Sequence, residues 1–93
     1  MINALRIHPK DSVVVALVDL APATPLVLAN APDLEIVTRE AIPFGHKVAI
    51  RPIPQGQQVI KYGASIGLAT QDIQPGEHVH VHNLTSVRGA VQR

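Results

Sequence analysis

The stretches PIPQGQQV (residues 52–59) and DIQPGEHV (residues 72–79) share one pattern, and this pattern indicates how the chain folds. Each has an apolar residue, two variable residues, a glycine, two variable residues and a second apolar residue. The stretch DLAPATPL (residues 19–26) fits the same template with Ala23 in place of the glycine. Glycine reaches positive φ without steric cost and suits the centre of a tight turn. Each copy therefore predicts an apolar anchor, a turn and an outgoing strand, although the hairpins of any β protein can recur in this way.

The rest of the chain has the same character. Eight prolines and six glycines divide it into pieces too short for ordinary helices. Between them lie aliphatic and β-branched runs, which favour strands. The expected strands are residues 12–20, 26–29, 34–37, 47–53, 58–62, 66–70 and 77–82, and residues 29–33 fit either a loop or one helical turn. The prediction is an all-β domain, a compact sandwich or barrel of short strands with tight Gly/Pro turns and little or no helix.

The composition predicts a single small domain over residues 1–93, with residues 1–10 and 85–93 as candidates for flexible ends. Hydrophobic residues make up 46% of the chain, but only Phe44 and Tyr62 are aromatic, so Val, Ile, Leu and Ala must build the core. A core this small leaves little room for an enclosed ligand site, which needs roughly 300 Å³ or more. The composition therefore argues against an enzyme that works alone.

Charge and cysteine content exclude several other classes of protein. The net charge is +1, and the eight basic and seven acidic residues are scattered, so nucleic-acid binding is not expected. The chain has no cysteine, which excludes disulfides and thiolate chemistry. No segment has the length and apolar character of a signal peptide or a membrane span. We therefore expect a cytoplasmic protein that does not associate with membranes.

The segment EHVHVHN is the strongest local signal for function. On a continuous strand, alternate side chains share a face, so His78, His80 and His82 would point to one side while Val79 and Val81 sealed the core on the other. Same-side neighbours on a strand are about 7 Å apart. Such imidazoles can be a solvated polar face, contact a substrate or a partner, or ligate a metal. His80 and His82 are the candidate metal ligands, and His78 is a candidate for substrate binding.

A second group of candidates follows the glycine of the run IPFGHKVAI. His46 comes directly after Gly45 and is expected to face inward or to lie at the rim of the domain. It is either a partly buried histidine with satisfied hydrogen bonds, or it projects with Lys47 at the domain edge. Lys47, Arg51 and Lys61 carry cations that can pair with a substrate carboxylate. Arg51 and Lys61 are candidate substrate-binding residues, with a solubilising role as the alternative.

Three runs carry a resemblance to a known family. These are VALVDL (residues 15–20), IPFGHKVAI (residues 42–50) and VIKYGASIGLATQDIQPGEHVHVHNL (residues 59–84), which together resemble the SAF domain of altronate and galactarate dehydratases. The resemblance implies a β-clip fold. In that family the domain accompanies a much larger catalytic part, either fused to it or as a separate small subunit. Members remove water from sugar acids such as altronate and galactarate, and a related two-subunit enzyme removes sulfite from sulfolactate.

The resemblance implies that this chain is the small, non-autonomous subunit of a hydro-lyase acting on sugar acids or related hydroxy acids. It would cover or complete the active site of a separate large subunit, with His46 and Lys47 as candidate catalytic residues. A divalent metal such as Fe or Mn, shared with or held by that large subunit, is the implied cofactor. The alternatives are a free-standing sugar-acid binding module, the small subunit of a sulfolactate sulfo-lyase, and a structural subunit that drives assembly, including a homo-oligomer.

Overall fold

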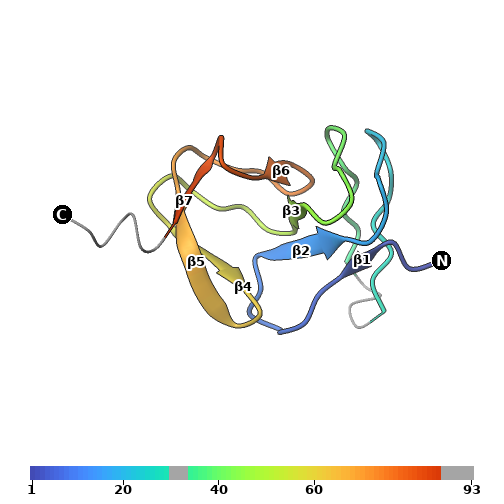
Figure 1. Ribbon diagram of the computed structural model, residues 1–93, viewed down its shortest axis with the longest axis horizontal. Coiled ribbons are helices and arrows are strands. Elements are labelled where there is room, and N and C mark those ends of the chain that lie inside the picture. Colours follow the sequence, from blue (N-terminus) through green and yellow to red (C-terminus); the bar gives the residue numbers. More distant parts are fainter. Residues whose placement is uncertain (30–33, 87–93) are drawn as a thin grey trace.

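The computed structural model describes residues 1–29 and 34–86 and shows an all-β architecture (Figure 1). Two small antiparallel sheets contain all the strands, and no helix occurs in the described part of the chain. The predicted all-β class is therefore confirmed. None of the described residues forms a helix with the length and apolar character needed to cross a membrane.

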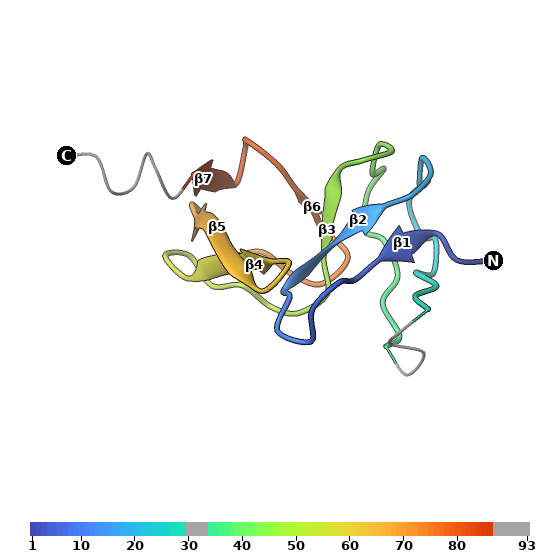
Figure 2. The same ribbon diagram turned by 60° about the horizontal axis from the view of Figure 1, so that its bottom comes forward.

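One sheet has four strands and the other has three. The first has the order β1-β2-β3-β6 and consists of β1 (Ala4–Leu5), β2 (Val13–Ala16), β3 (Lys47–Ala49) and β6 (His78–Val79). The second has the order β4-β5-β7 and consists of β4 (Gln58–Lys61), β5 (Ala64–Ala69) and β7 (Leu84–Ser86). The two sheets lie next to each other along the long axis of the molecule (Figure 2).

The strands are shorter than the sequence predicted. The strand expected over residues 12–20 ends at Ala16, and Leu17 and Val18 after it are exposed. The strand expected over residues 77–82 is reduced to β6. Val81 is 82% exposed, so the prediction that Val81 seals the core is wrong. The physical reason is a turn after β6, described below.

The remaining predictions concern residues 26–37 and the two ends of the chain. The strands expected over residues 26–29 and 34–37 are represented by a single bridge, in which Pro25 pairs with Val37. The alternative of a loop or a helical turn concerns residues 29–33, of which 30–33 lie outside the described residues. Of the two candidate flexible ends, residues 1–10 contain β1, and residues 87–93 lie outside the described part.

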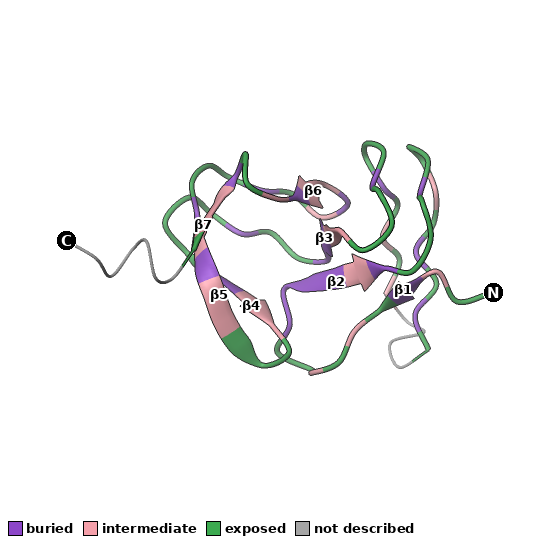
Figure 3. Cartoon of the chain, viewed as in Figure 1, coloured by how far each residue is buried: buried purple, intermediate pink, exposed green. Residues whose placement is uncertain are grey.

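Strand β2 separates two apolar cores because both of its faces are buried (Figure 3). Val14 is 1% exposed and packs in a first core with Ile42, whereas Val13 is 1% exposed and packs in a second core with Ile73. Adjacent residues of a strand point to opposite faces, so the run of valines supplies both cores. The prediction that this segment is buried on both faces is correct for β2.

The repeated template is the organising element of the fold. Its turn centres all have positive φ, namely Ala23, Gly45, Gly56 and Gly76. Gly45 belongs to a fourth copy, residues 42–48, in addition to the three predicted from the sequence. The copies associate in pairs, and their anchors bond reciprocally: Leu20 with Ile42 at 2.8 Å in both directions, and Ile53 with Ile73 at 2.9 Å in both directions.

Carboxylates fix the paired turns. Asp19 Oδ1 accepts the N–H of Phe44 at 2.8 Å, and Asp72 Oδ1 accepts the N–H of Gln55 at 2.8 Å. In both pairs, therefore, an aspartate just before one anchor caps the turn of the other copy. Gly76 is the most constrained turn centre, with φ of 92° and an approach so close that a Cβ there would lie 2.2 Å from the Val37 carbonyl oxygen.

Asp11 joins the N-terminal segment to the second sheet. It is 1% exposed, and its two carboxylate oxygens accept the backbone N–H groups of Gly63 at 2.8 Å and His8 at 3.1 Å. Burial on its own raises the pKa of Asp11, but the hydrogen bonds from Gly63 and His8 outweigh burial and leave the pKa of this carboxyl below its ordinary value. Asp11 is therefore a structural anion at the β4–β5 hairpin.

Candidate functional site

Two of the repeat copies bring histidines together at the edge of the four-stranded sheet. His46 directly precedes β3, and His78 opens β6, whose register pairs His78 with Val48 of β3. His46 and His78 thus lie on the same side of neighbouring strands. Their rings stack with centroids 5.0 Å apart, and His46 Nδ1 lies 2.9 Å from His78 Nε2.

His80 completes this group. Its ring stacks on His46 with centroids 4.3 Å apart and on His78 with centroids 5.5 Å apart. One ring nitrogen from each residue takes part in a set whose members all lie within 4.8 Å of one another. All three side chains are half-buried. We call His46, His78 and His80 the histidine cluster, and these three residues could hold a metal ion.

His82, a predicted metal ligand, lies beside the cluster rather than in it. Its ring is tilted by 42° against that of His78 with centroids 5.3 Å apart, and the residue is exposed. On the continuous strand predicted for residues 77–82, His78, His80 and His82 would share one face. That geometry is wrong because β6 ends at Val79. The rings gather because the chain turns after β6, and His46, predicted for a catalytic role, supplies the third nitrogen.

Asn83 shapes this turn and was not singled out from the sequence. Its side chain is 3% exposed, Oδ1 accepts the N–H of His80 at 2.9 Å, and Nδ2 donates to the carbonyl of His78 at 2.8 Å. The N–H of Asn83 also donates to the carbonyl of His80 at 3.1 Å. Asparagine after a histidine-rich run was an available signal, because Asn side chains favour turns by bonding nearby backbone.

Burial and neighbouring charges lower the pKa of two members of the cluster, His78 and His80. Burial, and then the nearby His46 and His82, lower the pKa of His78, while Glu40 opposes this shift. Partial burial, and then His46 and Lys47, lower the pKa of His80. Glu40 is close because its Oε2 accepts the N–H of His78 at 2.9 Å. Neutral imidazoles keep the lone pairs that a metal or an acidic proton requires.

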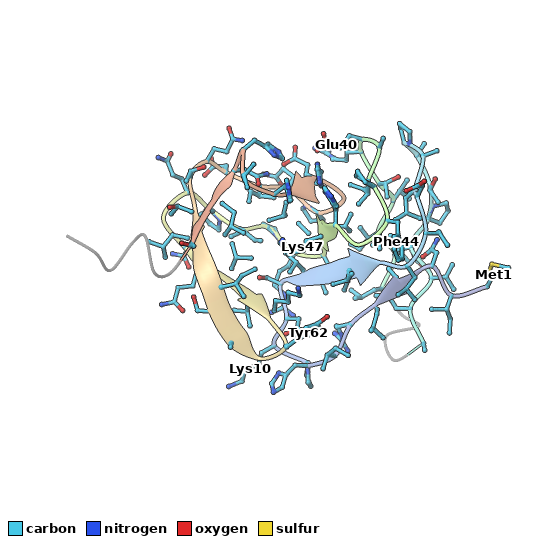
Figure 4. The ribbon with its side chains drawn as sticks, in the orientation of Figure 1. Met1, Lys10, Glu40, Phe44, Lys47 and Tyr62 are labelled. Carbon is cyan, nitrogen blue, oxygen red and sulfur yellow. The ribbon has the colours of Figure 1, made fainter. Side chains whose placement is uncertain are left out.

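Lys47 lies between His46 and Val48 in sequence and therefore points to the opposite face of β3 from both. Its cross-strand partners are Val15 and Val79, and it is half-buried. Burial, and then the charge of Lys61, lower the pKa of Lys47. Figure 4 labels Lys47 near the middle of the molecule, between Glu40 on one side and Tyr62 on the other. The charge of Lys61 acts on Lys47, and the charge of Lys47 acts on His80, so Lys47 lies near both residues.

The two remaining candidates have different surroundings. Lys61 Nζ lies 4.8 Å from the centre of the Tyr62 ring, and Lys61 belongs with Lys47 to a pair of neighbouring cations. Arg51 is exposed and donates to the carbonyl of Pro9 at 3.3 Å, which ties it to the N-terminal segment. The structure thus brings Lys61 near Lys47, and it ties Arg51 to the N-terminal segment instead.

The sequence model of the altronate/galactarate dehydratase SAF domain matches residues 2–87. The chain belongs to this family. The SAF domain is 40% identical over 83 residues to an altronate dehydratase of Bacillus subtilis, a match that covers 89% of this chain and 16% of that protein. It is 44% identical over 79 residues to an altronate dehydratase of Escherichia coli, with 85% of this chain and 15% of that protein covered. The chain therefore spans about a sixth of these relatives.

A further relative is a short protein. The (2R)-sulfolactate sulfo-lyase subunit alpha of Paracoccus pantotrophus is 38% identical over 63 residues, a match that covers 68% of this chain and 94% of that subunit. The subunit alpha of Chromohalobacter salexigens is 49% identical over 55 residues, with 59% of this chain and 58% of the subunit covered. The SAF domain thus has relatives in two arrangements, as a small part of a long dehydratase and as most of a separately named lyase subunit.

The SAF domain supplies nitrogen bases but no carboxylate cluster in its described residues. Five of its acidic side chains accept backbone N–H groups and thus have structural roles: Asp11, Asp19, Glu40, Asp72 and Glu77. The described residues also enclose no cavity. The arrangement can bind a cation or an acidic proton at the cluster and an anion at Lys47, but it does not surround a substrate.

Proposed function

We propose that this SAF domain is the small, non-autonomous subunit of a lyase that acts on sugar acids or related hydroxy acids. The observation that carries the proposal is the match to 94% of a separately named lyase subunit alpha, by a chain that also matches altronate dehydratases. The histidine cluster, on the edge of the four-stranded sheet, would cover or complete the active site of a large catalytic subunit.

The two reactions named for the relatives, dehydration and loss of sulfite, share their first step. Dehydration of a hydroxy acid and loss of sulfite from sulfolactate both begin when a base takes the proton next to the carboxylate. The C–H electron pair then forms the double bond, and the neighbouring C–O or C–S bond breaks with its electron pair. Hydroxide leaves as water after protonation, and sulfite leaves as the anion. A divalent metal such as iron or manganese, bound where the two subunits meet, would stabilise the enediolate charge as a Lewis acid.

The residues of this chain fit part of that task. Lys61, the cation next to Lys47, would hold the carboxylate of the substrate as its charged partner. Lys47 would carry a proton, since burial and the charge of Lys61 favour its neutral form and a neutral amine is a base. Removal of the proton and departure of the leaving group require both an acid and a base, and the remaining groups would come from the large subunit.

Reconstitution tests the proposal. The chain and its cognate large subunit are assayed separately and as an equimolar mixture, with galactarate, altronate and (2R)-sulfolactate as substrates and with chromatography of the products. We expect activity only in the mixture. Full activity of the large subunit alone would show that this chain is not needed. Tight binding of a hexonate by the isolated, metal-free chain, measured by calorimetry, would favour a free-standing sugar-acid binding module instead.

A further inference from the structure

We infer that His46, His78 and His80 form a metal-binding site that this chain completes by itself, with open coordination positions for an α-hydroxycarboxylate. The inference deepens the proposed function, and it rests on that function only for the use to which the site is put. Metal binding by the isolated chain needs no partner, so its failure and the failure of the lyase role can be distinguished.

The distances between the ring nitrogens fit a metal centre. Imidazole nitrogens bind Zn²⁺ at about 2.0–2.1 Å, so two ligands lie about 2.9 Å apart at a right angle and about 3.4 Å apart at a tetrahedral angle. His46 Nδ1 and His78 Nε2 are 2.9 Å apart. The whole set lies within 4.8 Å, which exceeds the ligand spacing by about 1.5–2 Å. Rotation of the imidazole rings about their broad terminal torsions would close this difference when an ion binds.

Hydrogen bonds around the cluster hold the backbone of the three histidines in place, so that only their rings would move when an ion binds. Asn83 fixes the backbone at His78 and His80 through two hydrogen bonds, and Glu40 accepts the N–H of His78. His46 follows the Gly45 turn, whose N–H donates to Ala16 of β2 at 2.9 Å. The three ligands thus come from a rigid scaffold, which lowers the entropic cost of binding. Hydrogen bonds and charges around the ligands tune metal sites in the same way.

The donor set selects among metal ions. Three imidazoles suit iron, cobalt, nickel and zinc, whereas manganese and magnesium prefer carboxylate and water oxygens. Affinity should therefore rise from manganese through iron to cobalt, and magnesium should not bind. This order favours iron over manganese, the two ions considered for the lyase.

The open positions point to the ligand class. Three protein ligands leave up to three positions free in an octahedral ion, and two of them accept the hydroxyl and one carboxylate oxygen of an α-hydroxycarboxylate. Lys47 directly follows His46 and is half-buried beside the cluster, so its amine can donate a hydrogen bond to the bound carboxylate. The cluster is half-buried at the domain edge, which leaves these positions accessible.

The test uses the untagged full chain and Co²⁺, whose visible spectrum reports the ligands. We expect one Co²⁺ per chain. His46→Ala, His78→Ala and His80→Ala should each weaken binding at least tenfold. His82→Ala and His8→Ala should change it less than threefold, because His82 is outside the nitrogen set and His8 lies at Gly63. Circular dichroism verifies that each variant is folded, and glutamine replacements that keep side-chain volume serve for any variant that is not.

A second measurement tests the open positions. Glycolate and acetate, which differ by the α-hydroxyl group, are added to the Co²⁺-loaded chain at equal concentration. Glycolate should change the spectrum at a concentration at least tenfold lower than acetate. Absence of saturable Co²⁺ binding, or equal losses for the His82 and His8 variants, would overturn the metal site. Identical responses to glycolate and acetate would overturn the chelation of a hydroxy acid.

Discussion

Replacement of Asn83 by alanine tests whether the turn after β6 holds the histidine cluster in place. The buried side chain makes two hydrogen bonds to backbone groups, one to the N–H of His80 at 2.9 Å and one to the carbonyl of His78 at 2.8 Å. Each is worth about 1 kcal/mol net, and a backbone group left without a partner costs about 1 kcal/mol more. We expect Asn83→Ala to lower the free energy of unfolding by about 2–3 kcal/mol, or the midpoint of thermal unfolding by about 10–20 °C.

The same variant should also loosen the site. Asn83 touches the backbone of two proposed ligands without being one, and loss of such supporting groups weakens metal binding about 10–100-fold. Asn83 is thus a positioning residue. Urea unfolding measures the stability, and Co²⁺ titration well below the unfolding midpoint measures the affinity.

Asn3 offers a matched control. Its side chain also makes two bonds to backbone, from Nδ2 to the carbonyl of Pro25 at 3.0 Å and from the N–H of Val27 to Oδ1 at 2.8 Å. The bonds of Asn3 are exposed to solvent, so Asn3→Ala should destabilise the fold by less than Asn83→Ala and leave Co²⁺ affinity unchanged. If Asn83→Ala unfolds like the wild type, or if Asn3→Ala weakens metal binding equally, the turn does not position the cluster.

Three further predictions concern stability. Gly76→Ala should be at least about 2 kcal/mol more destabilising in urea than Gly56→Ala, because both have positive φ but only at Gly76 would a Cβ meet backbone, and equal losses would contradict the steric argument. Because the pKa of Asp11 is lowered in the folded state, its carboxylate stabilises the fold above the unfolded pKa of about 3.9, and this stabilisation is lost as pH falls through the folded pKa. The difference in unfolding free energy between wild type and Asp11→Asn should therefore shrink below about pH 4. Val81→Ser should change the free energy of unfolding by less than about 0.5 kcal/mol in urea, since Val81 is 82% exposed. A loss as large as that of a core valine would mean that Val81 is buried, as the continuous strand predicted.

The all-β class could be predicted because turn chemistry is local. Gly56 and Gly76 are placed at the turn centres of their copies, and the φ values of 87° and 92° show why glycine stands there. The pairing of the copies could not be predicted, because Leu20 and Ile42 meet through space and no periodicity records which anchors bond. The fourth copy, residues 42–48, also fits the template in sequence, but its role is evident only from its pairing with the copy that contains Leu20.

The candidate site was predicted in its residue types and not in its geometry. Alternation along EHVHVHN placed three rings on one face, whereas Asn83 ends the strand and bends the chain. A local hydrogen bond thus prevailed over strand periodicity. His46 joins His78 only through the β3–β6 pairing, which connects residues far apart in sequence.

The pairing of the repeat copies also affects how the protein reaches its native state. His46 belongs to the pair joined through Leu20 and Ile42, and His78 to the pair joined through Ile53 and Ile73. A chain that has formed one pair alone has no complete ligand set, so an ion would discriminate against half-folded molecules. At a hundredfold excess over its dissociation constant it would favour the finished fold by about 2.7 kcal/mol. A bound metal would then raise the fraction of newly made chains in which both pairs have formed.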